Sequence, residues 1–334
     1  MAIATPPTAT PKAERTIPNY RQQIRKALPD HIFKPDYLNL LWFPVHFAIF
    51  GTGFYLLATH FSLWAAPIIA LVIGHSMACM GFLAHDICHG GSIKNLFVRD
   101  ALALTGFSWL GISPLLWRKW HNADHHNNTQ IKGVDPDHLF MLEDCKHNPI
   151  LKFLYIIHPV LRNLIIFGSF FFRMSQQQIR MVIVYLRDKD TSVVEKACIL
   201  AQAALGIAIW CAITIPLGSQ VFWWGYFIPL LVGNFIAISY IATNHFLNPL
   251  ADENDILETS LTVTLPNGLK WLDPWHQYFG AHVAHHLFPT VSGRYTRQIE
   301  EKAKELFPQH YHSMSLFKAL QMLWKTPWVY EDNT

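Results

Sequence analysis

The chain has 334 residues, of which 51% are hydrophobic and only 15% are charged, against about 25% charged residues in an ordinary soluble domain. Its formal net charge of +3 at pH 7 is too small to indicate a nucleic-acid-binding protein. The five cysteines form no C-x-x-C pair, so neither a disulfide framework nor a thiolate metal site is expected.

The chain is predicted to divide into three parts. Residues 1–35 are expected to form a flexible tail and then an interfacial segment near residues 20–34, because the start is rich in Pro and Thr and lacks the apolar core of a signal peptide. Residues 36–310 are expected to form one membrane domain, and residues 311–334 a cytosolic C-terminal tail.

Two long stretches, residues 37–84 and 197–251, contain no Asp, Glu, Lys or Arg. Each is long enough for two helices across a hydrocarbon core of about 30 Å, and each contains a short place to turn. We therefore predict an all-α integral membrane protein with four transmembrane helices in two hairpins and a cytosolic helical cap. The predicted spans are about residues 38–59, 64–84, 197–216 and 221–243.

All 26 Lys and Arg residues lie outside these runs, and the short turns within the hairpins carry none. Positive residues favour the cytosolic side of a membrane. Both termini and the long segment between the hairpins are therefore expected to face the cytosol.

Two shorter apolar stretches lie between the hairpins. Residues 101–117 are uncharged but contain Gly, Ser and Pro, and we expect an interfacial or half-inserted helix. A full span would place the histidines that follow it on the far side of the membrane from His85. Residues 150–172 contain Lys152 and Arg162 and are expected to form a second surface-lying helix.

Nine of the 19 histidines fall into four groups beside the predicted spans or in cytosolic segments. On a helix, residues i, i+3 and i+4 share one face, so each cluster would present its imidazoles in one direction, as metal ligands do. The groups are His85 and His89 in HDICHGG, His121, His125 and His126 in HNADHH, His245 alone after the fourth span, and His282, His285 and His286 in HVAHH.

Nine imidazoles exceed the three protein ligands of a catalytic zinc, and they fit a dinuclear centre with four or five nitrogens per metal. Imidazole suits Fe, Cu, Ni and Zn. Two iron ions are favoured because iron changes oxidation state and uses O2, and the sequence has no H-E-x-x-H motif. Hydrogen-bond partners for the ligand rings are sought among Asp86, Asp124, Asp135 and Asp137, and Asn244 or Asn248 is considered as a further metal contact.

Several other residues have a structural interpretation. His46, His60 and His75 lie in or beside the spans and are expected to be hydrogen-bonded core residues. His276 is left outside the ligand set. Trp223, Trp224 and Tyr226 begin the fourth span and are interpreted as an aromatic belt at the non-cytosolic boundary.

The motifs HDICHGG, HNADHHNNTQIKGVDPD and HVAHHLFP resemble those of the integral-membrane fatty-acid desaturase family, over about residues 37–310. The second and third motifs are similar to the acyl-lipid and front-end branch. The resemblance implies four spanning helices beneath a cytosolic cap, a di-iron centre, O2 as co-substrate and an acyl chain in a buried tunnel. It implies the eight clustered histidines as ligands and His245 as an additional one.

The resemblance also implies an acyl-lipid or fatty acyl substrate among membrane lipids. The chain keeps His282 where many front-end members have Gln, and it lacks the H-P-G-G motif of a fused cytochrome b5 domain. A separate electron donor of ferredoxin or cytochrome b5 type is therefore expected. Candidates for the acyl pocket are Phe82, Trp109, Trp117 and Phe246, and candidates to meet a headgroup or donor are Arg118, Lys119, Arg294 and Arg297.

Two other functions stay open on sequence grounds. A hydroxylase, ketolase or oxidative decarboxylase would use the same di-iron site, because substrate position alone decides whether a double bond or an alcohol forms. A metal-transporting membrane protein would need polar residues through its spans, and the second hairpin offers little beyond Gln202, Asn234 and Ser239.

Overall fold

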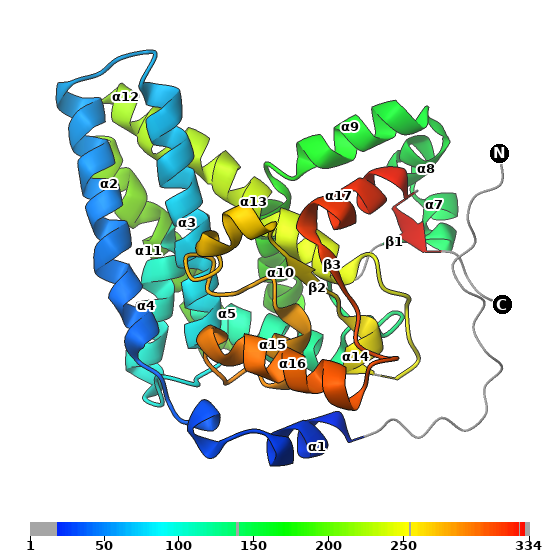
Figure 1. Cartoon of the computed structure of the whole chain (residues 1–334). Coiled ribbons are helices and arrows are strands. Elements are labelled where there is room, and N and C mark those ends of the chain that lie inside the picture. Colours follow the sequence, from blue (N-terminus) through cyan, green and yellow to red (C-terminus); the bar gives the residue numbers. More distant parts are fainter. Residues whose placement is uncertain (1–18, 138–139, 254, 327, 331–334) are drawn as a thin grey trace.

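The computed structural model describes residues 19–137, 140–253, 255–326 and 328–330. The flexible tail predicted for the start of the chain falls mostly on residues 1–18, which lie outside the described residues. The described part is an assembly of helices with four very short strands (Figure 1). The all-α prediction is therefore confirmed.

The α-helices are α1 (Tyr20–Ala27), α2 (Trp42–Thr59), α3 (Ala66–Cys88), α4 (Leu96–Phe107), α5 (Pro114–Trp117), α6 (His126–Asn128), α7 (Leu142–His147), α8 (Pro149–Ile156), α9 (Pro159–Ser169), α10 (Arg173–Arg187), α11 (Val193–Thr214), α12 (Ser219–Phe222), α13 (Ile228–His245), α14 (Ile256–Thr259), α15 (His282–Leu287), α16 (Thr296–Leu306) and α17 (Leu316–Lys325). Shorter 3₁₀ turns are η1 (Asp30–Phe33), η2 (Leu38–Leu41), η3 (Ser108–Leu110), η6 (Asn267–Leu272) and η7 (Gly293–Tyr295), and η4 (Arg118–His125) and η5 (Trp223–Phe227) are π-helical. The strands are β1 (Phe140–Met141), β2 (Thr262–Thr264), β3 (Ser313–Ser315) and β4 (Val329–Tyr330).

Four helical segments of the described chain are long and apolar enough to cross a membrane, as predicted. Two of them extend beyond the uncharged runs. α3 continues to Cys88, so His85 lies on the helix itself, and α11 begins at Val193. Ser192 caps α11 by accepting a hydrogen bond from the backbone N–H of Glu195, whose side chain accepts one from Ser192 in return. The segments cover Leu38–Thr59, Ala66–Cys88, Val193–Thr214 and Ser219–His245.

The central helix of the bundle is α3. Its most apolar window is 61% buried, against 22% for that of α11, and it packs against α13, α4 and α2. At Gly74 the approach to α13 is so close that a Cβ atom would lie 2.5 Å from the Cβ of Val232. A small residue at such a crossing lets two membrane helices pack at short range.

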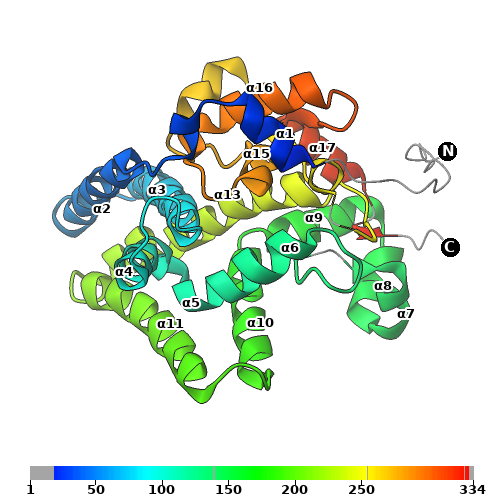
Figure 2. The same ribbon diagram turned by 90° about the horizontal axis from the view of Figure 1, so that it is seen from below.

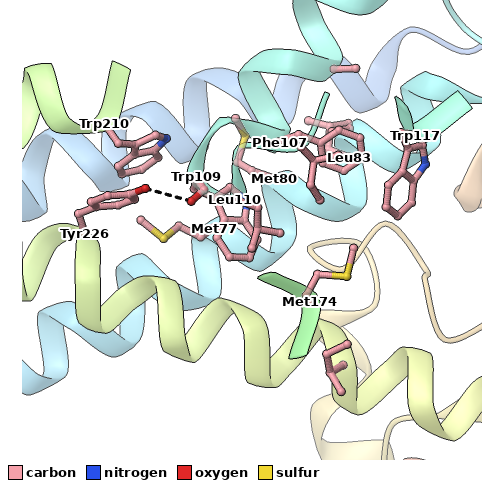
Figure 3. Packing of buried hydrophobic residues seen from close by; sticks show 14 of the residues in the cluster. Met77, Met80, Leu83, Phe107, Trp109, Leu110, Trp117, Met174, Trp210 and Tyr226 are labelled. Carbon is pink, nitrogen blue, oxygen red and sulfur yellow. Dashed lines mark hydrogen bonds between the residues drawn. The ribbon is translucent and has the colours of Figure 1, made fainter. Parts of the chain in front are cut away.

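Residues 101–117 form a hairpin made of the end of α4, then η3 and α5. The chain reverses at Gly111, which has a φ of +65°, and the reversal is held by a hydrogen bond from the Tyr226 hydroxyl to the Trp109 carbonyl at 3.3 Å (Figure 3). The chain thus returns to the end of the bundle where α3 stops, and His121 lies beside His85. An interfacial or half-inserted position for this segment stays a prediction.

The stretch 150–172 forms two helices, α8 and α9, where one was expected. Pro159 is the first residue of α9. Proline lacks the backbone N–H that a helix continuing from α8 would need at this position. Large apolar side chains such as Ile150, Phe153 and Leu164 are exposed on these helices, which is compatible with the surface-lying position that was predicted.

A cap closes the end of the bundle opposite the hairpin turns. Figure 2, seen from below, shows α1, α15 and α16 on one side of α13, and α5, α6 and α10 on the other. Ile24 of α1, Val283 of α15 and Ile299 of α16 are fully buried in one hydrophobic cluster. α1 thereby closes the cap from outside.

The C-terminal stretch that was predicted as a tail folds against the rest of the chain. β3 pairs in parallel with β2, and β4 pairs in parallel with β1. Between them α17 packs on α13 and buries Ala319 and Leu323 completely. The three-part division of the chain stays a prediction.

Gly74→Ala is expected to lower the stability of the bundle by about 1–3 kcal/mol, because the added methyl group meets Val232 across a tight crossing. Gly51→Ala is the matched control, since nothing lies within 4 Å of its added Cβ and alanine favours a helix over glycine. Thermal unfolding in detergent, followed by size-exclusion fluorescence, should therefore show opposite shifts for the two variants. Equal shifts would contradict this packing.

Candidate metal centre

The first pair of histidines ends the second transmembrane segment. His85 lies in the last turn of α3 and His89 caps the helix. Their spacing of four residues places both rings on one face, and the two Nε2 atoms are 3.4 Å apart.

The second cluster lies on the π-helix η4 rather than on an α-helix. His121 and His125 would share a face in either geometry, but in an α-helix His126 would be rotated by about 140° from His121. Here the backbone N–H of His126 bonds to the carbonyl of His121, five residues earlier, and this wider turn brings all three rings to one side. Such π segments are frequent at functional sites.

The third cluster occupies the short helix α15, where His282, His285 and His286 are spaced i, i+3 and i+4. Arg21 of α1 donates to the carbonyl of Leu287 at 2.9 Å and to that of His286 at 3.1 Å. A cation at a helix C-terminus satisfies carbonyls that the helix leaves without partners. α1 therefore helps to hold this ligand helix in place.

Five of the nine histidines form one group, in which one ring nitrogen of each lies within 4.8 Å of the others. Their Nε2 atoms face each other: His121 is 2.9 Å from His85 and 3.1 Å from His126, and His126 is 3.2 Å from His285. The group comprises His85, His89, His121, His126 and His285.

The other four histidines form a second, adjoining group. Ring nitrogens of His125, His245 and His286 lie within 4.8 Å of one another. His282 joins them through Nε2 contacts of 2.6 Å to His245 and 3.0 Å to His286. The rings of His126 and His286 stack at 4.2 Å where the two groups meet.

These distances fit the geometry of shared metal ions. Two imidazole nitrogens each about 2.0–2.1 Å from one ion, the usual Zn–N distance, and separated by about 90–109° lie roughly 2.9–3.4 Å apart. Most of the Nε2–Nε2 separations fall near this interval. The donors are all imidazole nitrogens, a ligand type that suits first-row transition metals.

The histidines outside the spans are held mainly in the neutral form that binds metal. Burial, and to a smaller extent the neighbouring rings, lowers the pKa of six of them, and for His285 the value is about 3. The six are His89, His121, His126, His282, His285 and His286. His125 differs: burial would lower its pKa, but the carboxylates of Asp135 and Asp137 raise it.

One of the four candidate aspartates is hydrogen-bonded to a ligand ring, and a second lies nearby. Asp135 Oδ1 lies 2.9 Å from His125 Nδ1 and Asp137 Oδ2 lies 3.7 Å from it. The other two have different partners, because Asp86 accepts a hydrogen bond from Asn39 and Asp124 accepts one from Tyr185.

Sequence reasoning did not assign Thr129 a partner. Its hydroxyl lies 3.3 Å from His286 Nδ1 and donates to the His125 carbonyl at 2.9 Å. It thus links one ligand of the second metal group to the backbone of another.

The two asparagines considered as metal contacts have different surroundings. The side chain of Asn244 is fully buried, and neither its oxygen nor its nitrogen has a hydrogen-bond partner among the described residues. Asn248 donates to the carbonyl of Asn244 at 2.8 Å. A metal contact from Asn244 therefore stays a prediction.

Of the residues proposed for the acyl pocket, Phe82 lies next to the centre, where it lines a crevice with His85 and His285. Trp117 stacks on His121 at 4.5 Å. Trp109 lies deeper, against the glycines of α3 and α13, and Phe246 packs near Trp328.

Each of the four cations proposed to meet a headgroup or donor has an acidic partner. The pairs are Arg118 with Asp100, Lys119 with Glu195, Arg294 with Asp36, and Arg297 with Glu301. The predicted aromatic belt is also only partly surface-exposed, since Trp223 is 49% exposed but Tyr226 is buried.

Another group was not found from the sequence. His75, Cys79 and His276 also bring potential ligand atoms within 4.8 Å of one another. The Nε2 atoms of His75 and His276 are 2.9 Å apart, and the Tyr240 hydroxyl lies 2.8 Å from His276 Nδ1. The sequence gives little signal for this group, because His276 reaches the bundle from a loop of the cap.

Comparison with known proteins decides the family. The sequence profile of the fatty acid desaturase family matches residues 62–318, which is most of the chain. The chain belongs to the fatty acid desaturase family. It is therefore an integral membrane oxidoreductase that acts on fatty acids, and its clustered histidines indicate a metal cofactor.

Three curated desaturases illustrate the range of relatives. An omega-6 fatty acid desaturase of the endoplasmic reticulum from Glycine max is 25% identical over 89% of this chain and 83% of its own length. An sn-1 acyl-lipid omega-3 desaturase (ferredoxin) from Synechocystis sp. is 24% identical over 93% of this chain and 88% of its own. An sn-1 linoleoyl-lipid 6-desaturase from Arthrospira platensis is 25% identical over 69% of this chain and 67% of its own.

Asp135→Asn is expected to weaken metal binding by about 10–100-fold, because the carboxylate that orients His125 is lost. Asp124→Asn is the matched control: it changes the aspartate next to His125 in the sequence, which contacts Tyr185 instead. Metal content after dialysis against a graded series of chelator concentrations measures the difference. The same loss in both variants would contradict the orienting role of Asp135.

Acidification is expected to lower the stability of the folded protein. In the unfolded chain a histidine takes up a proton below about pH 6.5, whereas the six lowered pKa values keep the folded rings neutral. Their contribution is complete above about pH 6.5 and is lost as the pH falls toward about 3, the pKa of His285. The raised pKa of His125 opposes this loss of stability, because the folded ring binds a proton more readily than the unfolded one.

The unfolding temperature should therefore fall over this interval, because protons bind the unfolded rings first, while the folded protein keeps its metal to about pH 4. Loss of metal from the still-folded protein between about pH 6.5 and about pH 5 would contradict the lowered pKa values.

Proposed function

We propose that this chain is an O2-dependent membrane acyl-lipid desaturase, and that its nine histidines hold two iron ions. The observation that carries the proposal is that ring nitrogens of five histidines gather within 4.8 Å of one another, and those of His125, His245 and His286 gather beside them with His282 in contact. Two such gatherings support a separate set of nitrogens for each of two metals. A single metal ion does not use nine imidazoles.

The residues around the ligands determine how they bind. Asp135 accepts backbone hydrogen bonds from Gln130 and Asp137 at 2.8 and 2.9 Å, so its carboxylate is fixed when it accepts the proton of His125 Nδ1. The Nε2 atom of His125 is then left with its lone pair toward the second group. Thr129 is placed to act on His286 in the same way.

Bound iron would supply the oxidising power, drawn from O2, that removes hydrogen from an unactivated methylene. The protein's part is to position the chain and to exclude water. His125, His282 and His286 are each 1% exposed. Trp117 covers His121 on one side, and Phe279 lies 5.0 Å from the ring of His85 on another.

The proposed substrate is an acyl chain carried by a membrane lipid. This rests on the membrane-spanning bundle, on family membership, and on relatives whose names specify acyl-lipid substrates. Those names carry different double-bond positions, so family membership supports the reaction class and not the position.

We further propose that the cap and both ends of the chain face the cytosol, as the distribution of Lys and Arg indicates. Electrons would then come from a separate carrier on that side. A relative whose name includes ferredoxin supports a small redox protein of ferredoxin type, and a cytochrome b5 type donor is the other candidate.

Expression in a host with a simple lipid profile tests the function. We expect lipids that have lost two hydrogens, formed only in the presence of O2, and at least about a 100-fold loss of product in His125→Ala. His147→Ala, a fully exposed position on α7, is the matched control and should behave as wild type.

Mass spectrometry of the lipids separates the alternatives. Lipids that gain one oxygen atom would identify a hydroxylase, and a shortened terminal alkene would identify a decarboxylase. Tightly bound zinc with no O2-dependent change in lipids would contradict the proposal.

A further inference from the structure

The loop between η6 and α15 has an unusual backbone. Gln277 and Tyr278 have φ values of +50° and +54°, a region that costs non-glycine residues free energy. Two such residues in succession persist only where the surroundings impose the conformation. The loop leads directly into His282, the first ligand of α15.

His276 anchors this loop in the membrane bundle. Its ring is buried, with Nε2 2.9 Å from Nε2 of His75 on α3 and Nδ1 2.8 Å from the hydroxyl of Tyr240 on α13. The loop is therefore tied to α3, which carries His85, and to α13, which ends at His245.

The anchored loop places Phe279 against the candidate metal centre. Its ring stacks on Phe82 of α3 at 4.4 Å and lies 5.0 Å from His85 and 5.5 Å from His282. These two histidines belong to different metal groups. The ring of Phe279 therefore lies beside one histidine of each metal group.

A crevice reaches the centre at the same place. It is lined by Phe82, Gln277, Tyr278, Phe279 and the rings of His85 and His285, among others. Its volume of about 20 Å³ has room for roughly one water molecule, and an acyl chain cannot enter it in this form. The stacked rings of Phe82 and Phe279 form one wall of this crevice.

We propose that Phe279 is the gate between the acyl chain and the metal centre, and that His276 is the positioning residue that sets this gate. The proposal rests on the desaturase function proposed above. Movement of the Phe279 ring lets the acyl chain reach the metal centre. When the ring lies as it does here, it limits how far the acyl chain can extend past the metals. The pair Phe279 and His276 thereby helps to select which carbons react.

Both ring nitrogens of His276 have hydrogen-bond partners that are not metals. Tyr240 meets one ring nitrogen and His75 meets the other, and the Cys79 sulfur stays 3.8 Å from the His75 ring nitrogens. A hydrogen-bonded anchor and a third metal site make different predictions for metal content, so one series of variants separates them.

The first measurement uses the product distribution of the active protein. Phe279→Leu is expected to keep its bound metal and to shift the ratio of double-bond positions or chain lengths several-fold. His276→Phe, which removes both polar contacts, should shift the ratio in the same direction, and His276→Gln, which can keep them, should restore it in part. Phe171→Ala, at a half-exposed ring distant in sequence, is the control.

The second measurement needs no turnover. Phe279→Ala opens the cover over His85, so release of bound iron to an external chelator should become several-fold faster than in wild type or in Phe171→Ala. Unchanged release and unchanged product ratios in the Phe279 variants would overturn the gate. Loss of one metal ion per chain in His276→Gln would overturn the anchor, because His276 would then be a ligand. A wild type with no desaturation would count against the proposed function, while the release rates would still decide the gate.

Discussion

The structure depends on keeping nine imidazoles close together without charging them. Protonated rings at separations near 3 Å would repel strongly in a site removed from water. Burial and mutual proximity lower the pKa of most of these rings, so they stay neutral and keep lone pairs for metal. Among the described residues of the centre, His125 is the ring whose Nδ1 lies 2.9 Å from the Asp135 carboxylate.

The membrane bundle sets where the rings lie. α3 and α13 cross tightly at Gly74, and both helices end in candidate ligands, His85 and His245. The hairpin of α4, η3 and α5 returns η4 to the same end, and the cap adds α15, which Arg21 holds from outside. The spacing of the two metal groups therefore follows from helix packing as well as from the local motifs.

The sequence predicts the parts of this structure that depend on local pattern. Uncharged runs locate the four spans, histidine spacing selects the eight clustered histidines, and the place after the fourth span selects His245. It does not reveal the π-helix that turns His126 inward, because that geometry depends on i to i+5 bonding and not on residue type. Proximity in the sequence also misassigned Asp86 and Asp124, whose partners come from other segments. His276 joins the bundle through a loop whose fold is imposed by distant contacts.

The central claim is that the nine histidines hold two metal ions. X-ray absorption at the iron edge of the purified protein, combined with metal analysis, tests it most directly. We predict two iron ions per chain with a first shell of nitrogen or oxygen near about 2.1 Å, similar to the known Zn–N distance. A single metal ion per chain, or a shell with sulfur near about 2.3 Å, would contradict it.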